Sequence, residues 1–392
     1  MKKTSTILAI ILSVTAGCGG GKQSATTSDD FITVDVTAKY PKKELILQDF
    51  MDVEYIPLET NDDFLCQGLV QAIGREIILV KNRVDDGDIF IFDRNGKAIK
   101  KINRKGQGGE EYTYILGIAL DEDNGEMFVN DHYKRKIFVY DLDGNFKRSF
   151  QHKDDAMYIR IFNFDRENLI CDDGQFSDDG TANRLSFRII SKLDGSVTKE
   201  IQIPFEKKIL TVLILKDEAS KMTYSASPSH QPFIPSFNSW ILVEPSSDTL
   251  YSYSPDHRMT PFIARTPPVQ SMDPEVFLFP NMITDRYYFI ETVKKVYDFG
   301  KRQGFPSTDL MYDRQEKAIF KYTVYNDDYS DKRPVYMKSQ PVNDEIATWQ
   351  RIDAHRLVEA NDKGELKGRL KEIAAELDEE SNPVIMLVKH KK

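Results

Sequence analysis

A pair of short apolar strands joined by a glycine turn occurs three times in this sequence, and this repeat constrains the fold most. The segment KIFVYDLDGNFKRSF, residues 136–150, alternates apolar and polar residues on both sides of Asp143-Gly144. Asp-Gly tolerates the positive φ angles of a tight turn, so the segment is expected to form an antiparallel hairpin. Similar segments surround Gly96 and Gly195, so the turns lie 48 and 51 residues apart. This period is close to the about 40–50 residues of a β-propeller blade.

Each repeat contains more than the hairpin. The second unit, residues 114–150, reads as strand, DEDNGE turn, strand, DHYKRK loop, strand, Asp-Gly turn and strand, which is one four-stranded blade. The first unit covers residues 69–102 and the third about 158–203. Later units are less regular: residues 240–264 keep three strands, and residues 286–324 form a fifth unit that turns near Gln315.

The sixth unit is expected in the C-terminal region, where NPVIMLVKH (382–390) is a strand signal. A ring of sheets buries their faces and protects their edges, so the two chain ends are expected to meet in one blade. Either FITVDV (31–36) or VEYIPLE (53–59) is predicted to add as the outer strand of the blade begun by VIMLVKH. The predicted fold is therefore an all-β, six-bladed β-propeller with four-stranded antiparallel blades, closed by an N-terminal strand.

One segment has helical periodicity. Between Gly364 and Glu380, apolar residues recur at steps of four, three and four, as in an amphipathic helix; they are Leu366, Leu370, Ile373 and Leu377. Asn361 or Asp362 is expected to cap this helix, and Asn382-Pro383 to end it. It is expected to pack against the flank of the propeller.

The N-terminus has the layout of an export signal. Two lysines precede an apolar run that is too short to span a membrane, followed by small residues that end at Cys18. The segment resembles a bacterial lipoprotein signal, with TAGC at the lipobox position. It implies that residues 1–17 are removed, that Cys18 carries the lipid, and that residues 18–30 form a flexible tether to a propeller spanning 31–392. The expected location is the cell envelope, anchored to the outer membrane on its periplasmic or exposed side; Cys66 and Cys171 are expected to be reduced thiols.

The inter-blade segment INRKGQGGEEYTYILGIALD and the blade segment GEMFVNDHYKRKIFVYDLDGNF resemble NHL repeats. The lipoprotein signal, the IPLET opening and the LKGRLKEIAAELDEESNPVIML ending resemble six-bladed β-propeller lipoproteins of Bacteroides-type bacteria. The function of that family is unknown. The resemblance therefore implies a fold and an envelope location, and it implies no catalytic residue.

Composition and motifs exclude several function classes. The net charge of −9 argues against a nucleic-acid surface, which needs a basic field. The chain has no G-x-S-x-G, P-loop, H-E-x-x-H or C-x-x-C motif, and its six histidines have no metal-ligand spacing. The acidic segments DEDNGE (121–126) and DDGQFSDDG (172–180) are interpreted as turns and not as calcium loops. Neither a metal nor another cofactor is expected.

Two groups of residues are candidates for ligand binding at a channel mouth. The first lies in the interruption between the third and fourth units, residues 222–240, and consists of Tyr224, His230 and Phe233, with Phe237 beside them. The second lies near the glycine-rich inter-blade segment and consists of Arg104, Tyr112, His132 and Arg135. A purely structural role of these side chains, covering blade edges or facing solvent, explains their presence equally well.

Two functions remain open. The first is a lipid-anchored binding or scaffolding propeller for a glycan, a peptide or an envelope protein. The second is an envelope hydrolase or lyase acting on carbohydrate, which needs paired carboxylates or a metal at the channel mouth. The missing catalytic motifs favour the binding module.

Overall fold

The computed structural model describes residues 31–391 except 84, 154–155, 175–186, 339, 341–342 and 344. The predicted signal peptide, Cys18 and the tether lie outside the described residues, as does most of the DDGQFSDDG segment. Within the described residues, no helix has the length and apolar character needed to cross a membrane.

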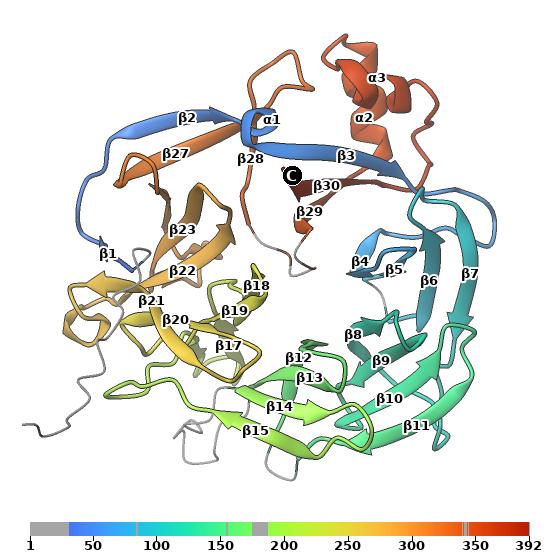
Figure 1. Cartoon of the computed structure of the whole chain (residues 1–392), viewed down its shortest axis with the longest axis horizontal. Coiled ribbons are helices and arrows are strands. Elements are labelled where there is room, and N and C mark those ends of the chain that lie inside the picture. Colours follow the sequence, from blue (N-terminus) through green and yellow to red (C-terminus); the bar gives the residue numbers. More distant parts are fainter. Residues whose placement is uncertain are drawn as a thin grey trace, which may run out of the picture.

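The described chain forms a ring of six blades, which confirms the predicted β-propeller (Figure 1). In the first three blades the strands follow one another from the channel outward. Blade 1 consists of β4 (Leu69–Ile73), β5 (Ile77–Lys81), β6 (Asp88–Asp93) and β7 (Ala98–Asn103). Blade 2 consists of β8 (Ile115–Asp121), β9 (Glu126–Asp131), β10 (Lys136–Asp141) and β11 (Phe146–Gln151). Blade 3 consists of β12 (Tyr158–Asn163), β13 (Asn168–Asp173), β14 (Phe187–Ser191) and β15 (Val197–Ile201).

Blades 4 and 5 each gain a parallel outer strand from the N-terminal region. Blade 4 contains β18 (Phe233–Ser236), β19 (Ser239–Leu242), β20 (Thr249–Tyr253) and β21 (Met259–Thr266), and β1 (Ile32–Asp35) pairs in parallel with β21. Blade 5 contains β22 (Val276–Ile283), β23 (Tyr287–Lys294), β26 (Ser307–Asp313) and β27 (Ala318–Asn326), and β2 (Lys42–Ile46) pairs in parallel with β27. The three strands predicted in residues 240–264 are confirmed as β19, β20 and β21, and the first strand of the blade, β18, lies before Trp240.

Blade 6 joins the two ends of the chain. Its strands are β29 (Ile346–Ile352), β30 (Val384–His390) and β3 (Met51–Pro57), in that order. The pairing of VEYIPLE with VIMLVKH is confirmed, since β3 runs antiparallel to β30 along its whole length. The alternative partner, FITVDV, is wrong because β1 joins blade 4. The prediction that VIMLVKH begins blade 6 is also wrong, because β29 precedes it in this blade.

Described residues that precede β29 are bonded to it through side chains. Thr348 Oγ1 donates to Lys338 O at 2.6 Å, and Gln350 Nε2 donates to Tyr336 O at 2.9 Å. Side-chain hydrogen bonds therefore attach Tyr336 and Lys338 to β29. Asn343 lies at the end of the channel where the first strands of blades 1–4 also end.

The predicted C-terminal helix is two shorter helices, α2 (Ala354–Asp362) and α3 (Gly368–Ala374). Asn361 and Asp362 end α2 and do not cap α3, and α3 ends well before Asn382-Pro383. Gly364 and Gly368 both have positive φ, which breaks the helical path between them. The predicted apolar stripe is nevertheless real, since Leu370 and Ile373 are buried against blades 5 and 6.

The remaining elements are short. They are α1 (Leu47–Phe50), the hairpin of β16 (Leu213–Lys216) and β17 (Thr223–Ala226), the 3₁₀ turn Val269–Ser271, β24 (Tyr297–Asp298), β25 (Gln303–Gly304) and β28 (Arg333–Val335).

The core consists of the interfaces between neighbouring blades. Among the described residues, buried apolar side chains form six clusters, one for each pair of adjacent blades. Successive residues of a strand point to opposite faces, so a middle strand must be apolar at every position. In β5, for example, Ile78 and Val80 pack against blade 6, whereas Ile77 and Leu79 pack against blade 2. The free thiols predicted at Cys66 and Cys171 are confirmed.

Candidate functional site

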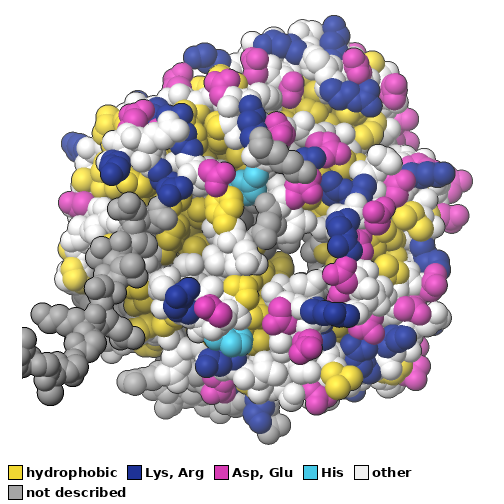
Figure 2. Space-filling model, in the orientation of Figure 1, with side chains coloured by type: hydrophobic (Ala, Val, Ile, Leu, Met, Phe, Trp, Pro, Cys, Tyr) yellow, Lys and Arg dark blue, Asp and Glu magenta, His cyan; other side chains and the backbone are white. Residues whose placement is uncertain are grey.

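One end of the channel contains a pocket of about 350 Å³. It lies where β4, β8, β12 and β18 end and turn outward, and Asn343 closes it from the side of blade 6. We call it the central pocket; its walls include Gln71, Arg75, Phe162, Asn163, Trp240 and Asn343. Figure 2 shows a hollow near the centre of the ring, with charged side chains gathered on one side and hydrophobic side chains on the other.

The turn between β4 and β5 shows how the sequence builds this rim. Glu122, from the corresponding turn of blade 2, accepts hydrogen bonds from the backbone N–H groups of Arg75 at 2.6 Å and Glu76 at 2.8 Å. A side chain at Gly74 would overlap with this carboxylate, so glycine is required by the close approach. The two turns are thereby fixed to each other.

Aromatic side chains form one wall of the central pocket. The Trp240 ring packs at 5.4 Å, edge to face, against buried Phe233, and at 6.3 Å from Phe162. Phe164 is stacked parallel to His257 at 5.9 Å. The Trp240 N–H makes no hydrogen bond with any residue that the structure describes. This wall therefore offers apolar ring faces and one available donor.

Amide side chains also line the pocket, and they come from several sides of the ring. Gln71 Nε2 donates to Leu69 O at 3.2 Å, while none of the described groups donates to its side-chain oxygen. Asn343 Oδ1 accepts from the backbone N–H of Ile346 at 2.8 Å, and Asn163 donates to Leu120 O. These bonds orient the amides, each of which has both donor and acceptor atoms.

The charged groups at the rim are largely paired with one another. Arg75, whose side chain is 70% exposed, forms an ion pair with Asp123, and the hydrogen bond from this pair raises the pKa of Arg75. Asp121 is buried and forms an ion pair with Lys192, whose Nζ lies 2.8 Å from Asp121 Oδ2. Burial alone would raise the pKa of Asp121, but hydrogen bonds from Lys192 and Asn124 outweigh it and lower this pKa.

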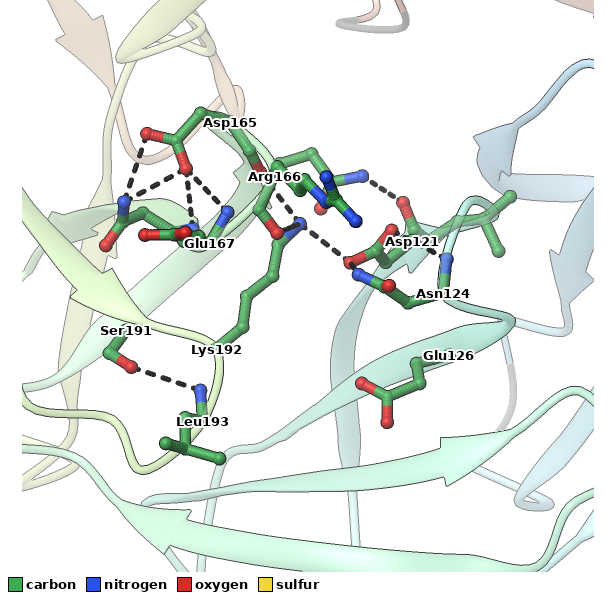
Figure 3. A network of polar contacts seen from close by, with 12 residues as sticks. Asp121, Asn124, Glu126, Asp165, Arg166, Glu167, Ser191, Lys192 and Leu193 are labelled. Atoms are coloured by element: carbon green, nitrogen blue, oxygen red, sulfur yellow. Dashed lines mark hydrogen bonds and ion pairs between the residues drawn. The ribbon is translucent and has the colours of Figure 1, made fainter.

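Figure 3 shows Lys192 reaching from blade 3 between Asp121 and the turn formed by residues 165–167. Besides the ion pair, Lys192 Nζ donates to Asp165 O at 2.8 Å and to Arg166 O at 3.3 Å. The backbone carbonyl of Lys192 accepts from Arg148, which also holds Glu126 through two bonds of 2.7 Å. This network locks blades 2 and 3 together directly behind the pocket.

The predicted residues of the 222–240 segment do not line the central pocket. Tyr224 lies on the exposed hairpin of β16 and β17, where its hydroxyl contacts Met222 Sδ. His230 is half-buried and stacked on Phe279 at 4.4 Å, and desolvation of its ring lowers its pKa to about 4. Phe233 is fully buried in the interface of blades 3 and 4, so its ring has no surface for a ligand.

The predicted residues of the second group do not line the central pocket either. Tyr112 is fully buried, and its hydroxyl donates to Gly87 O at 2.6 Å and accepts from the Arg104 backbone at 2.9 Å. Arg104 Nε donates to Gly144 O at 2.8 Å, and Arg135 donates to Ala156 O. His132 contacts two tyrosine rings, Tyr114 and Tyr133, at 5.9 and 5.0 Å. The structure therefore gives most of these residues structural contacts and does not bring the two groups together.

Sequence reasoning missed the residues that surround the central pocket. A signal was present: the first strand of each unit leads to a turn, and in a ring of equivalent units these turns meet at one end of the channel. The turns after Ile73, Asp121 and Asn163 occupy equivalent positions in the first three units. The participation of Asn343 had no such signal, because its segment has no strand pattern.

Comparison with known proteins agrees with this architecture. Residues 22–348 match the family model DUF5128, described as a 6-bladed beta-propeller. The chain belongs to this family. A Bacteroides fragilis protein described as a candidate exported protein is similar in structure, with a TM-score of 0.59 at 13% identity over 93% of this chain and 99% of that chain. A member of the DUF4221 family from Bacteroides vulgatus has a TM-score of 0.47 at 11% identity, covering 87% and 98% of the two chains. No curated protein matches this DUF5128 propeller in sequence.

Proposed function

We propose that this DUF5128 propeller is a binding module of the bacterial cell envelope and that its central pocket holds a glycan. The observation that carries the proposal is the composition of the pocket, which is lined by aromatic rings and by amide side chains. A sugar ring has an apolar C–H face and a rim of hydroxyl groups. Aromatic rings pack against the former, and side chains with both a donor and an acceptor bind the latter.

The pocket suits a small ligand better than a partner protein. Its volume of about 350 Å³ lies at the lower end of the about 300–1,000 Å³ of typical ligand sites. A stable protein interface instead buries about 800 Å² on each partner and has an apolar centre. One or two sugar units are the occupants that match this size and polarity.

The chemistry of the pocket supports binding and not catalysis. Each carboxylate that lines it already has a partner: Asp121 binds Lys192, Glu122 accepts backbone N–H groups, and Asp123 binds Arg75. A hydrolase of carbohydrate needs a pair of carboxylates free to act on the two sides of the bond. We therefore do not advance the hydrolase or lyase as the function of this pocket.

The envelope location is part of the same proposal. We infer from the N-terminal sequence that Cys18 carries the lipid and that the tether of residues 18–30 connects it to the propeller. The description of the Bacteroides fragilis relative as a candidate exported protein is in keeping with export. Replacement of Cys18 by serine is expected to abolish metabolic labelling with palmitate and to release the protein from the membrane fraction.

Glycan binding is tested by isothermal titration calorimetry of the full chain in detergent. The probes are neutral linear oligosaccharides of one to six units from the malto, cello, xylo and manno series. The Trp240→Phe variant keeps the ring packing but loses the N–H donor, and we expect it to bind about tenfold more weakly, as for one lost hydrogen bond. Tyr133→Ser removes a 71% exposed ring that does not line the central pocket and should leave affinity unchanged. Failure of all four series to bind would refute the glycan proposal.

A further inference from the structure

A second hollow of about 260 Å³ lies beside the central pocket, between blades 4 and 5. We call it the side pocket. Its walls come from the turn between β18 and β19, from β20 and β21, and from the turn between β22 and β23. Ser239 lines both pockets, and in the adjacent turn Phe237 lines the side pocket while Asn238 lines the central pocket. The end of the β18–β19 hairpin, with this turn at its tip, therefore lies between the two hollows.

This turn has an unusual residue. Phe237 and Asn238 both have positive φ, at 45° and 59°, as in the tight turns that favour Asn and Gly. A bulky residue in this conformation is uncommon, and glycine would be more favourable for the backbone. The Phe237 ring is nevertheless 46% exposed at the rim of the side pocket, and His390 at the end of blade 6 packs against it at 5.2 Å. The ring is thus presented to solvent in a fixed position.

The lining of the side pocket is rich in hydroxyl groups. Ser239 Oγ donates to Ser236 O at 2.6 Å and accepts from Ser252 Oγ at 3.2 Å, so these hydroxyls form an ordered row. Behind them, the rings of Phe262 and Tyr288 pack at 4.9 Å. Hydroxyls over aromatic rings offer the same two kinds of contact as the central pocket.

Charge does not favour an ionic ligand in the side pocket. The two charged residues that line it, Asp285 and Arg314, have opposite sign. They also belong to adjacent turns that are joined to each other, since Arg314 Nη1 donates to Asp285 O at 2.7 Å. The guanidinium also lies over the Tyr288 ring at 5.7 Å. An uncharged, hydroxylated ligand is the better match.

We propose that the two pockets are subsites of one groove and that the ligand is a neutral linear oligosaccharide which crosses the Phe237 turn. This inference rests on the proposed function, because the central pocket supplies the first subsite. Phe237 stacks against the sugar unit that passes from one pocket to the other. Affinity should therefore rise with chain length until the side pocket is filled.

The test uses the oligosaccharide series that binds the full chain in the calorimetric titration. In the wild type, affinity should rise at least tenfold between the shortest ligand that binds and the hexamer. The Phe237→Gly variant removes the ring and relieves the backbone conformation, so it should fold at least as well as the wild type. It should bind the shortest ligand normally and lose most of the gain with length. Tyr133→Ser serves again as the control for an exposed ring.

The outcomes separate this inference from the function on which it rests. Equal affinity for short and long ligands, or an unchanged gain with length in Phe237→Gly, would overturn the side pocket as a subsite and leave the central pocket in place. Absence of binding for every series would overturn both proposals. A loss of length dependence in Phe237→Gly with normal unfolding in urea supports the groove.

Discussion

Replacement of Lys192 by methionine should destabilise the propeller strongly. In the native protein the Lys192 side chain is only 7% exposed and its Nζ contacts Asp121 Oδ2, Asp165 O and Arg166 O. Methionine fills much of the same volume but leaves the buried Asp121 carboxylate without its cation. Breaking a buried ion pair by removing one partner costs about 3–5 kcal/mol, and the two carbonyls also lose their donor. That is a large share of the about 5–15 kcal/mol that stabilises a typical folded protein.

The free energy of unfolding is measured from urea titrations at pH 7, followed by circular dichroism and tryptophan fluorescence. Coincidence of the two curves justifies a two-state fit. Lys100→Met is the matched control, because Lys100 pairs with Asp143 on the surface and an exposed pair is worth about 0–1 kcal/mol. The double variant Asp121→Asn with Lys192→Met removes the stranded charge and should regain at least half of the loss.

The pH dependence gives an independent check of the same reasoning. In the wild type the pKa of Asp121 is lowered. The ionised carboxylate therefore stabilises the folded protein at pH values above the pKa of this residue in the unfolded chain. This stabilisation is lost as the pH falls through the pKa of Asp121 in the folded protein. In Lys192→Met the hydrogen bond that lowers the pKa of Asp121 is missing. Burial, which raises this pKa, should then dominate, so the pKa of Asp121 should rise. Protonation near pH 4 then neutralises the stranded carboxylate, so the deficit of Lys192→Met should be smaller at pH 4 than at pH 7. A loss below 1 kcal/mol at pH 7, or an equal loss at both pH values, would refute the role given to this pair.

Three further substitutions test other parts of the structure. Gly96→Ala should lower the free energy of unfolding in urea by about 1–3 kcal/mol more than Gly125→Ala does. Both positions have positive φ, but only at Gly96 would the new Cβ overlap with a backbone oxygen, that of Pro57. Equal losses in the two variants would contradict the close packing of these turns. His230→Phe should reduce the loss of stability between pH 6.5 and pH 4. The pKa of His230 is about 4 in the folded protein and 6.5 for a free histidine, so the unfolded chain takes up a proton at a higher pH than the folded protein does. This difference lowers the free energy of unfolding by at most about 3 kcal/mol at pH 4. An unchanged pH profile in that variant would show that the ring is not kept neutral. Tyr112→Phe should lose about 1–3 kcal/mol, since it leaves the Gly87 carbonyl and the Arg104 N–H without their buried partner; thermal unfolding near the wild-type temperature would argue otherwise.

The sequence was sufficient to predict the ring but not its details. The repeat of hairpins identified the blades because each middle strand must be apolar on both faces, and this requirement is visible in segments such as 77–80. It also identified VEYIPLE as one of two candidate partners of the C-terminal strand, and the structure shows that VEYIPLE is the partner. FITVDV was predicted as an outer strand and forms β1, but its place on blade 4 was not predicted, and neither was β2, because a strand added to an outer edge needs no pattern that identifies its partner. The single predicted helix divides into α2 and α3 because two glycines with positive φ interrupt the apolar stripe.

The candidate site was less accessible to sequence analysis. Aromatic and histidine residues in an irregular segment suggested a binding loop, but Phe233 is buried between blades and the His230 ring is stacked on Phe279. Side chains of the same type serve as core or as binding surface, and only the path of the backbone decides between the two. Trp240 stands at the end of the same segment and lines the central pocket, because the strand that precedes it brings it to the rim. Residue type alone could not distinguish Trp240 from Phe233.

The order in which the N-terminal strands join the ring determines which strand pairings break first when a pulling force is applied at residue 31. A pull there first loads β1 on blade 4, then β2 on blade 5, and only afterwards β3, which completes blade 6. The first two strands can detach while the six sheets remain closed. Force applied at residue 31 must therefore separate β1 and then β2 before it reaches the pairing of β3 with β30 that closes the ring.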